Sequence, residues 1–394
     1  MFKSIIKIFS SHVFVKLIGL LNIAVILKFL PVSDFGEYSY YLLMLHLIAI
    51  IIDPFLSAYL VEYKLNSYKK YNVGIFLFTL ILLPLFYLIL YYNFLVELKI
   101  FLLFSFSFII SGVLKSFLNI NERFFRYGLV DVFRQLSIFI STLVFFYILK
   151  KHNFLFLLEF NYTICLIVMV GLLPFLIRKK EIFIDIKYTT LKTFFKNSKF
   201  LIFYTALIPI IAFIDSFFVE KYLSEEKLGL YSFSLKVYSI SLMLVVPMFT
   251  VLNIKQIEIA KEKKYNEFFS KNIKKVFSFS FVLFLLAVLA NYLITYYFYT
   301  NYKDSFLDTT ILLGGAFVTY LSMPFSFLIA YKKYKSLFFL TILALISNIS
   351  INYIFISKYG TVIAALSTFL SQIIINFGVA FLSYYLIYDK KSSK

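Results

Sequence analysis

The stretch LLNIAVILKFLPVSDFGEYSYYLLMLHLIAIIIDPFLSAYLVE, residues 20–62, decides the fold. It holds the end of one apolar segment, a polar turn at residues 31–37, and a second apolar segment interrupted near its end by Asp53 and Pro54. As helices, apolar segments of about 20 residues are long enough to cross the roughly 30 Å hydrocarbon layer of a bilayer. The stretch therefore predicts two transmembrane helices joined by a tight turn.

A version of this stretch returns as KYLSEEKLGLYSFSLKVYSISLMLVVPM, residues 221–248. Adding 193 to the residue number takes Gly36 to Gly229 and Pro54 to Pro247. The whole chain has only 11 Gly and 7 Pro, so a match of both residue types at one offset indicates an internal duplication. The offset maps the second predicted span onto the eighth, so each repeat contains six helices.

The composition is that of a polytopic membrane protein. Hydrophobic residues make up 62% of the chain, charged residues 15%, and the mean hydropathy is +0.90, well outside the range of soluble domains. The backbone polar groups of a lipid-exposed segment must be paired within the segment, so the spans must be helices. The single Cys165 excludes an intrachain disulfide. No small-residue cleavage site follows the first apolar run, so we expect that span to be retained.

Twelve apolar segments recur along the chain. They are residues 11–30, 38–60, 73–92, 98–118, 128–149, 155–177, 200–219, 229–252, 276–298, 307–330, 337–356 and 361–387. We therefore expect an all-α polytopic membrane protein with two six-helix lobes, residues 1–177 and 200–394, joined by a basic cytoplasmic linker at 178–199. Because six is an even number, the lobes share one orientation and a pseudo-two-fold axis along the membrane normal.

The distribution of Lys and Arg predicts the orientation. Of the 39 basic residues, 27 fall on the side of both termini, six on the other side and six within the spans. Cytoplasmic loops carry the excess of Lys and Arg, so both termini are expected in the cytoplasm. Topology and attraction to anionic membrane lipids explain the net charge of +19, and no nucleic-acid partner is needed.

Charged residues inside the spans are the candidate functional residues, because each costs about 2.5 to 3.5 kcal/mol at a helix centre unless it is paired or hydrated. Near the span ends, Lys28, Lys99, Lys115 and Glu159 are expected to reach the interface. Six others are harder to place there: Lys16, Asp53, Asp131, Arg134, Asp215 and Lys236. Two interpretations stay open for these six. They form salt bridges between helices, or the cations line a hydrated cleft for an anionic ligand while the acids pair with them or couple transport to an ion.

Polar side chains also recur at helical spacing. Asp131, Arg134, Gln135 and Thr142 share one predicted helix face, which points to protein or water and not to lipid. Interhelical hydrogen bonding is the favoured role for the pairs Asn348 and Asn352, and Gln372 and Asn376, over contact with sugar hydroxyls.

Two prolines interrupt spans at related heights. Pro54 and Pro247 each free a backbone carbonyl and bend their helix, so they are candidate hinges between conformations or devices that set the curvature of a lobe.

The chain lacks the motifs of cofactor and enzyme chemistry. It has no phosphate-cradling glycine loop, no cluster with metal-ligand spacing and no nucleophile triad. We therefore expect no cofactor, no catalytic residue and no enzymatic activity.

Two segments resemble a known family. PVSDFGEYSYYLLM (31–44) and its repeat at 223–236 resemble the turn after the first helix of each lobe in O-antigen (Wzx-type) polysaccharide flippases of the MOP exporter superfamily. NISINYIFISKYGTVIAALSTFLSQ (348–372) resembles the last hairpin of that family. The chain departs from the family at Thr361, Val362 and Ile363, where relatives often place a glycine.

The resemblance implies a lipopolysaccharide-biosynthesis or related flippase in the bacterial inner membrane. Such a protein moves an undecaprenyl-diphosphate-linked oligosaccharide from the cytoplasmic to the outer leaflet by alternating access, in contact with membrane lipids and with other glycan-assembly membrane proteins. By location, Lys16 and Arg134, with Lys236 and Lys115 behind them, would form the cationic substrate cavity. The alternative is a MATE-like drug or metabolite antiporter, whose cleft would present unpaired acids such as Asp53 or Asp215. A membrane polymerase or ligase ranks far behind, because the predicted outer loops are too short to hold a catalytic domain.

Overall fold

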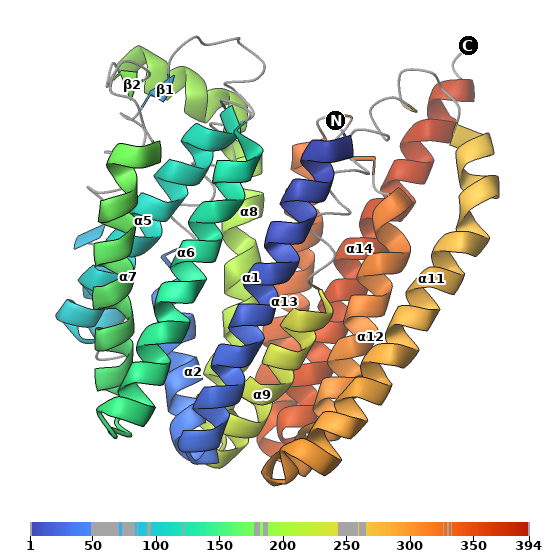
Figure 1. The fold of residues 1–394 in the computed structure, drawn as a ribbon. Helices are drawn as coiled ribbons and strands as arrows, with labels where there is room; N and C mark the ends of the chain where they lie inside the picture. The colour runs from blue at the N-terminus through green and yellow to red at the C-terminus, as the bar shows by residue number, and fades with distance from the viewer. Residues whose placement is uncertain are drawn as a thin grey trace. The chain divides into compact units, whose positions relative to one another are not determined.

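The computed structural model describes most of the chain (Figure 1). The described residues are 2–48, 71–72, 83–84, 86–92, 96–120, 123–176, 182–183, 188–242, 259, 265–325, 327–328, 331 and 333–392. Among the residues singled out from the sequence, Asp53, Pro54 and Pro247 lie outside this part of the chain, so the proposed hinges stay predictions.

The chain divides into two compact units, residues 1–210 and 211–394. The described part of the first unit includes the helices α1 (Phe2–Phe29), α2 (Val32–His46), α5 (Leu98–Ile120), α6 (Phe124–Leu143) and α7 (Phe154–Leu176). A π-helical turn, η1 (Val144–Ile148), continues α6. In unit 1, α6 packs against α1, α5 and α7, so its polar residues can meet three neighbouring helices.

Helix α8 (Tyr188–Tyr222) crosses the boundary between the units. It begins inside residues 178–199, which the sequence suggested as a linker, so part of that segment is helical. Two short strands precede it in the chain. β1 (Tyr71–Asn72) pairs in parallel with β2 (Ile182–Phe183), with Tyr71 opposite Ile182.

Five further helices lie in the described part of the second unit. They are α9 (Glu225–Ser241), α11 (Tyr265–Leu293), α12 (Phe306–Ser322), α13 (Tyr334–Tyr359) and α14 (Thr361–Ser392). Short turns extend two of them: η3 (Ile294–Phe298) continues α11, while η4 (Thr300–Ser305) and η5 (Met323–Phe325) flank α12. Helix α14 packs against both α12 and α13 in this unit (Figure 1).

The described helices have the length and apolar character that a bilayer requires. Within the described residues, eight helices are long and apolar enough to cross a membrane. The span Asn272–Phe298 has a mean hydropathy of 2.2 but is only 11% buried inside the protein. An apolar helix with so little burial keeps its side chains out of water only if lipid covers them.

The duplication extends to the helix boundaries. Helix α1 ends at Phe29 and α8 ends at Tyr222, a separation of 193 residues. Helix α2 begins at Val32 and α9 begins at Glu225, again 193 residues apart. Burial follows the same register, since the matched pairs Phe35 and Leu228, Gly36 and Gly229, Tyr38 and Tyr231, and Ser39 and Ser232 are all buried. The two repeats therefore fold this turn in the same way.

Local chemistry fixes where the second helix of each repeat begins. Ser224 is the N-cap of α9, and its hydroxyl accepts a hydrogen bond from the backbone N–H of Lys227 at 3.3 Å. Glu225 and Glu226 occupy the first turn, where the positive end of the helix dipole favours acids. In the first repeat Pro31 holds the N-cap position at φ −63° and Asp34 lies in the first turn.

A glycine makes the turn between α13 and α14 possible. Gly360 has φ +71° and ψ −154°, a conformation open almost only to glycine. We expect Gly360→Ala to lower the free energy of unfolding by about 1–3 kcal/mol. Thermal unfolding of the purified protein in detergent measures the change.

Gly171 provides a matched control for this prediction. It lies inside α7, and an added Cβ would meet nothing within 4 Å. Gly171→Ala should therefore leave the melting temperature unchanged or raise it slightly. Equal effects of the two substitutions would show that the backbone conformation at Gly360 is not the cause.

Candidate functional site

The carboxylate of Asp215 is almost completely enclosed by the protein. Its side chain lies on α8 and is only 1% exposed. Five neutral side chains donate hydrogen bonds to it. Oδ1 accepts from Asn348 Nδ2 (3.0 Å), Asn352 Nδ2 (2.7 Å) and Ser367 Oγ (2.8 Å), and Oδ2 accepts from Tyr231 Oη (3.2 Å) and from Thr368 Oγ1. We call these six residues the Asp215 cluster.

Four helices position the Asp215 cluster. Asn348 and Asn352 lie one turn apart on α13, so their amides point to the same side. Ser367 and Thr368 are adjacent on α14, and Tyr231 is the fully buried residue of α9 that matches Tyr38 of the first repeat. From the sequence, salt bridging to Lys236 was one possible role for Asp215. In the structure the hydrogen bonds to Asp215 come from neutral groups instead.

One acceptor in the Asp215 cluster has no donor. The side-chain oxygen of Asn352 is buried and makes no hydrogen bond. An unpaired polar atom and a carboxylate without a neighbouring cation are both costly in a low-dielectric interior. The cluster thus combines one negative charge with amide and hydroxyl oxygens, a set suited to a proton or a small monovalent cation. Within the described residues no group of three or more His, Cys, Asp or Glu side chains could hold a metal ion.

The first repeat has a neutral residue at the matching position. Subtracting 193 from Asp215 gives Asn22, which is 6% exposed and whose side-chain oxygen also lacks a hydrogen bond. Of the two matched positions, only the one in the second repeat carries an acid, so the two repeats differ in charge at equivalent places.

In the first unit, Lys115 and Asp131 form an ion pair. The two side chains join α5 to α6 with an Nζ to Oδ2 distance of 2.8 Å, and their exposures are 27% and 15%. Lys115 Nζ also lies 5.0 Å from the centre of the Tyr127 ring. The sequence predicts that Lys115 reaches the interface; in the structure its ammonium group pairs with Asp131 and lies near the Tyr127 ring.

Arg134 lies beside this ion pair. Its guanidinium carbon is 5.3 Å from the centre of the Phe108 ring, and the side chain is close to Tyr162 and Cys165 of α7. We call Lys115, Asp131 and Arg134 the cationic cluster, because it holds two positive charges and one negative charge. Among the described residues, no acidic side chain lies within ion-pair distance of Arg134 or of Lys16.

The predicted polar face of span 128–149 contacts three neighbouring helices, α5, α7 and α1. Asp131 faces α5, and Thr142 accepts a hydrogen bond from Asn161 Nδ2 of α7 at 3.0 Å. Gln135 faces α1, where a Cβ added to Gly19 would lie 3.4 Å from Gln135 Nε2. Lys16 is three residues before Gly19, near the middle of the 28-residue α1, and is exposed. The face is therefore divided between contacts with neighbouring helices and Arg134, which contacts the Phe108 ring and has no acidic partner among the described residues.

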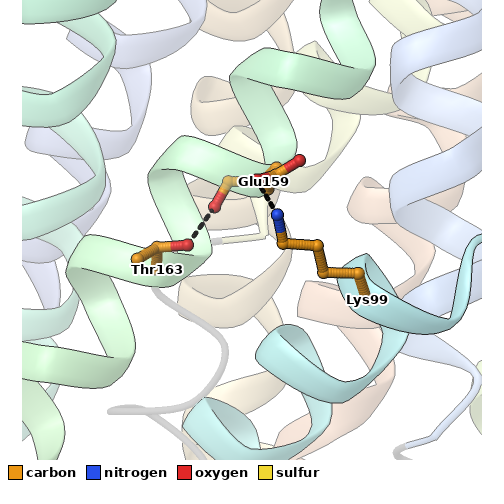
Figure 2. Close-up of polar contacts among 3 residues, drawn as sticks. All are labelled: Lys99, Glu159 and Thr163. Carbon is orange, nitrogen blue, oxygen red and sulfur yellow. Dashed lines mark hydrogen bonds and ion pairs between the residues drawn. The ribbon is translucent and has the colours of Figure 1, made fainter.

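Other charges near span ends have local roles. Figure 2 shows Lys99 of α5 donating to Glu159 of α7 at 2.5 Å, while Thr163 Oγ1 donates to the backbone oxygen of Glu159 at 2.8 Å. Lys28 Nζ lies 5.7 Å from the centre of the Tyr147 ring. Lys236 is partly exposed on α9, outside the hydrogen-bonding shell of Asp215.

Solved structures of membrane transporters share this fold. An inward-facing multidrug resistance MATE family transporter of the MOP superfamily matches with a TM-score of 0.68 at 13% identity, covering 99% of both chains. A MOP superfamily transporter from Pyrococcus furiosus, described by the reverse polarity of its binding pocket, matches with a TM-score of 0.68 at 14% identity over 99% of this chain and 96% of that one. The lipid II flippase MurJ matches with a TM-score of 0.67 at 17% identity over 98% of this chain and 92% of that one.

These matches confirm the fold prediction. The chain is an all-α polytopic membrane protein with the twelve-helix fold of MOP superfamily transporters. No protein-family model matches the chain, and the comparison with curated proteins gives no match.

The cationic cluster predicts a difference in stability between two ion pairs. Asp131→Asn leaves Lys115 next to Arg134 without an acid, so we expect a loss of about 1–3 kcal/mol in unfolding free energy. Glu159→Gln breaks the pair with Lys99, whose side chain is 68% exposed, and should cost less than about 1 kcal/mol. Thermal unfolding of both variants in detergent compares the two losses.

A second substitution separates charge from packing. In the Asp131→Asn background, Lys115→Gln removes the unpaired cation and should restore part of the lost stability. If the double variant is as unstable as the sum of the single variants, the charge interaction is not what Asp131 contributes.

Proposed function

We propose that this protein is a flippase that carries a polyprenyl-diphosphate-linked oligosaccharide from the cytoplasmic to the outer leaflet by alternating access. The supporting observation is the positive balance of unit 1, where Arg134 and Lys16 are cations without an acidic partner in the described residues. A cation held in a membrane-spanning helix is costly unless it meets water or an anion. The diphosphate of a lipid carrier is such an anion.

The chemistry of the two cations suits a diphosphate. The planar guanidinium of Arg134 offers several N–H donors in a fixed fork, which matches phosphate oxygens. Lys16 adds a flexible point charge from α1, the neighbour of α6. An inside-negative membrane potential also favours outward movement of an anion, by about 2.3 kcal/mol per charge per 100 mV.

The sign of the charge in the binding region distinguishes a flippase for an anionic lipid from an antiporter for cationic drugs. An antiporter for cationic drugs needs accessible carboxylates, whereas Asp131 is paired with Lys115 and Asp215 is enclosed by five donors. The Pyrococcus furiosus transporter with this fold is described as having a binding pocket of reverse polarity that suggests a different function, and the MurJ structure is that of a lipid II flippase. The first shows that pocket polarity differs among transporters with this fold, and the second supports a lipid-linked substrate for this chain.

The Asp215 cluster has a second role in this proposal. It would bind and release a proton or a monovalent cation during the transport cycle, because the only charge in the cluster is a single carboxylate, whose neighbours are neutral amides and hydroxyls. The neutral Asn22 at the matching position of the first repeat supports a coupling site in the second unit only.

Removing the two free cations should stop transport. We expect Arg134→Gln and Lys16→Gln together to abolish display of the surface glycan, because the diphosphate loses its charge partners. Glycan on the cell surface and protein in the membrane fraction are measured in parallel. Lys99→Gln is the control, since this exposed lysine pairs with Glu159, and it should leave glycan display intact. Normal display with the double variant would contradict the assignment of the cationic site.

Deleting the gene tests the substrate class. We expect lipid-linked oligosaccharide to accumulate on the cytoplasmic side of the membrane, where it stays protected from glycosidases added outside the cell. An unchanged pool together with altered sensitivity to cationic drugs would favour the antiporter instead.

Asp215→Asn tests the coupling site. The substitution keeps the shape of the side chain and removes its charge, so we expect the purified protein to lose its uptake of Na⁺ or of one proton, measured by calorimetry and by proton release. Asp304→Asn, at an exposed aspartate of η4, is the control and should bind as the wild type does. Unchanged ion binding in Asp215→Asn would assign Asp215 a purely structural role.

A further inference from the structure

A groove lies on the second unit between α9, α11 and α12. It has a volume of about 260 Å³ and is partly open. Leu313 and Ala316 of α12 are almost fully buried at its base, whereas Leu286 of α11 lines it and is 57% exposed. The remaining lining is mostly apolar: Ile240, Leu283, Phe284, Ala287, Phe317 and Tyr320. The exposed Leu286 places one rim of the groove on the lipid-facing side of α11, which lies beside α12 (Figure 1).

A single polar atom in the groove lacks a partner. Ser280 lines the groove, its side chain is 0% exposed, and its hydroxyl makes no hydrogen bond. Within a bilayer no bulk water reaches such a group, so an unpaired hydroxyl there is costly. A ligand that brings an oxygen acceptor to this point would remove the cost.

Two lysines lie one to two turns before Ser280 on the same helix. Lys274 and Lys275 are both exposed near the N-terminal end of the Asn272–Phe298 span. Lys275 comes eleven residues before Leu286, close to three full turns, so it lies on the same side of α11 as the groove rim. The order along α11 is therefore cation, hydroxyl and apolar groove.

We propose that this groove binds an anionic glycerophospholipid. The phosphate lies at Lys275, with Lys274 adding positive charge from the other side of α11, an ester carbonyl accepts a hydrogen bond from Ser280, and one acyl chain fills the groove. At 1.5 Å and about 100° per residue, Ser280 is about 7.5 Å along the axis and about 140° around the helix from Lys275, so the long Lys275 side chain and the glycerol backbone together span the separation. A polyprenyl carrier lipid has no ester carbonyl next to its phosphate, so Ser280 favours the glycerophospholipid. This site is separate from the proposed transport function and does not rest on it.

The absence of tryptophan from the chain gives a direct test. Phe317→Trp places one fluorophore in the groove, and Leu285→Trp places one on α11 at an exposed residue that does not line the groove. Each variant is purified in detergent and titrated with phosphatidylglycerol carrying brominated acyl chains, which quench nearby tryptophan. We expect the groove tryptophan to be quenched saturably at about tenfold lower lipid concentration than the control, since burial of one or two methylene groups is worth that factor.

Further substitutions check each part of the site. Ala287→Phe should fill the groove and abolish the saturable quenching of the groove tryptophan, without changing that of Leu285→Trp. Brominated phosphatidylcholine should quench less effectively than phosphatidylglycerol, and Lys274→Gln with Lys275→Gln should remove that preference. Ser280→Ala should weaken binding of both lipids.

Three results would overturn the proposal. The first is quenching of both tryptophans at the same lipid concentration, and the second is no effect of Ala287→Phe. The third is displacement of the brominated lipid by polyprenyl phosphate at lower concentration than by unlabelled phosphatidylglycerol, which would assign the groove to the carrier lipid.

Discussion

Hydrocarbon cannot solvate charge, and this constraint governs the polar groups of both units. Charged side chains are stabilised in three ways. Lys115 pairs with Asp131, Arg134 contacts an aromatic ring, and Asp215 accepts hydrogen bonds from five neutral donors. Paired charges hold helices together, since each partner would be costly alone. A charged group without an opposite charge is therefore the place where binding of a ligand or ion of opposite charge lowers the free energy most. Arg134 and Lys16 in unit 1 are such groups and are positive, whereas Asp215 in unit 2 is negative.

The two repeats share the same backbone turn but carry different charges at one matched position. The end of the first helix, the start of the second and the buried face of the turn coincide at a single offset of 193 residues. The helix boundaries of the two repeats match. At the matched buried position, the first repeat has the amide of Asn22 and the second has the carboxylate of Asp215. The fold thus supplies two equivalent positions, and only one of them carries a group that can change its charge.

The sequence predicts the helices well because a bilayer demands long apolar runs. Spans such as 98–118 and 361–387 agree closely with α5 and α14. The contacts of the charged residues are harder to predict, since helical spacing fixes which residues share a face but not which neighbour that face meets. Asp131, Gln135 and Thr142 share one stripe and yet contact three different helices. The shell of Asp215 could not be foreseen either, because its amide donors lie more than 130 residues away in the chain.

The one cysteine of the chain gives the molecule an experimental advantage. Cys165 is fully buried in α7, so its thiol is shielded from aqueous reagents. The natural protein can therefore serve directly as the unreactive background for site-directed thiol labelling, without first replacing native residues. A cysteine introduced at a chosen position would report, through its rate of modification from either side of the membrane, which faces become wet as the protein works.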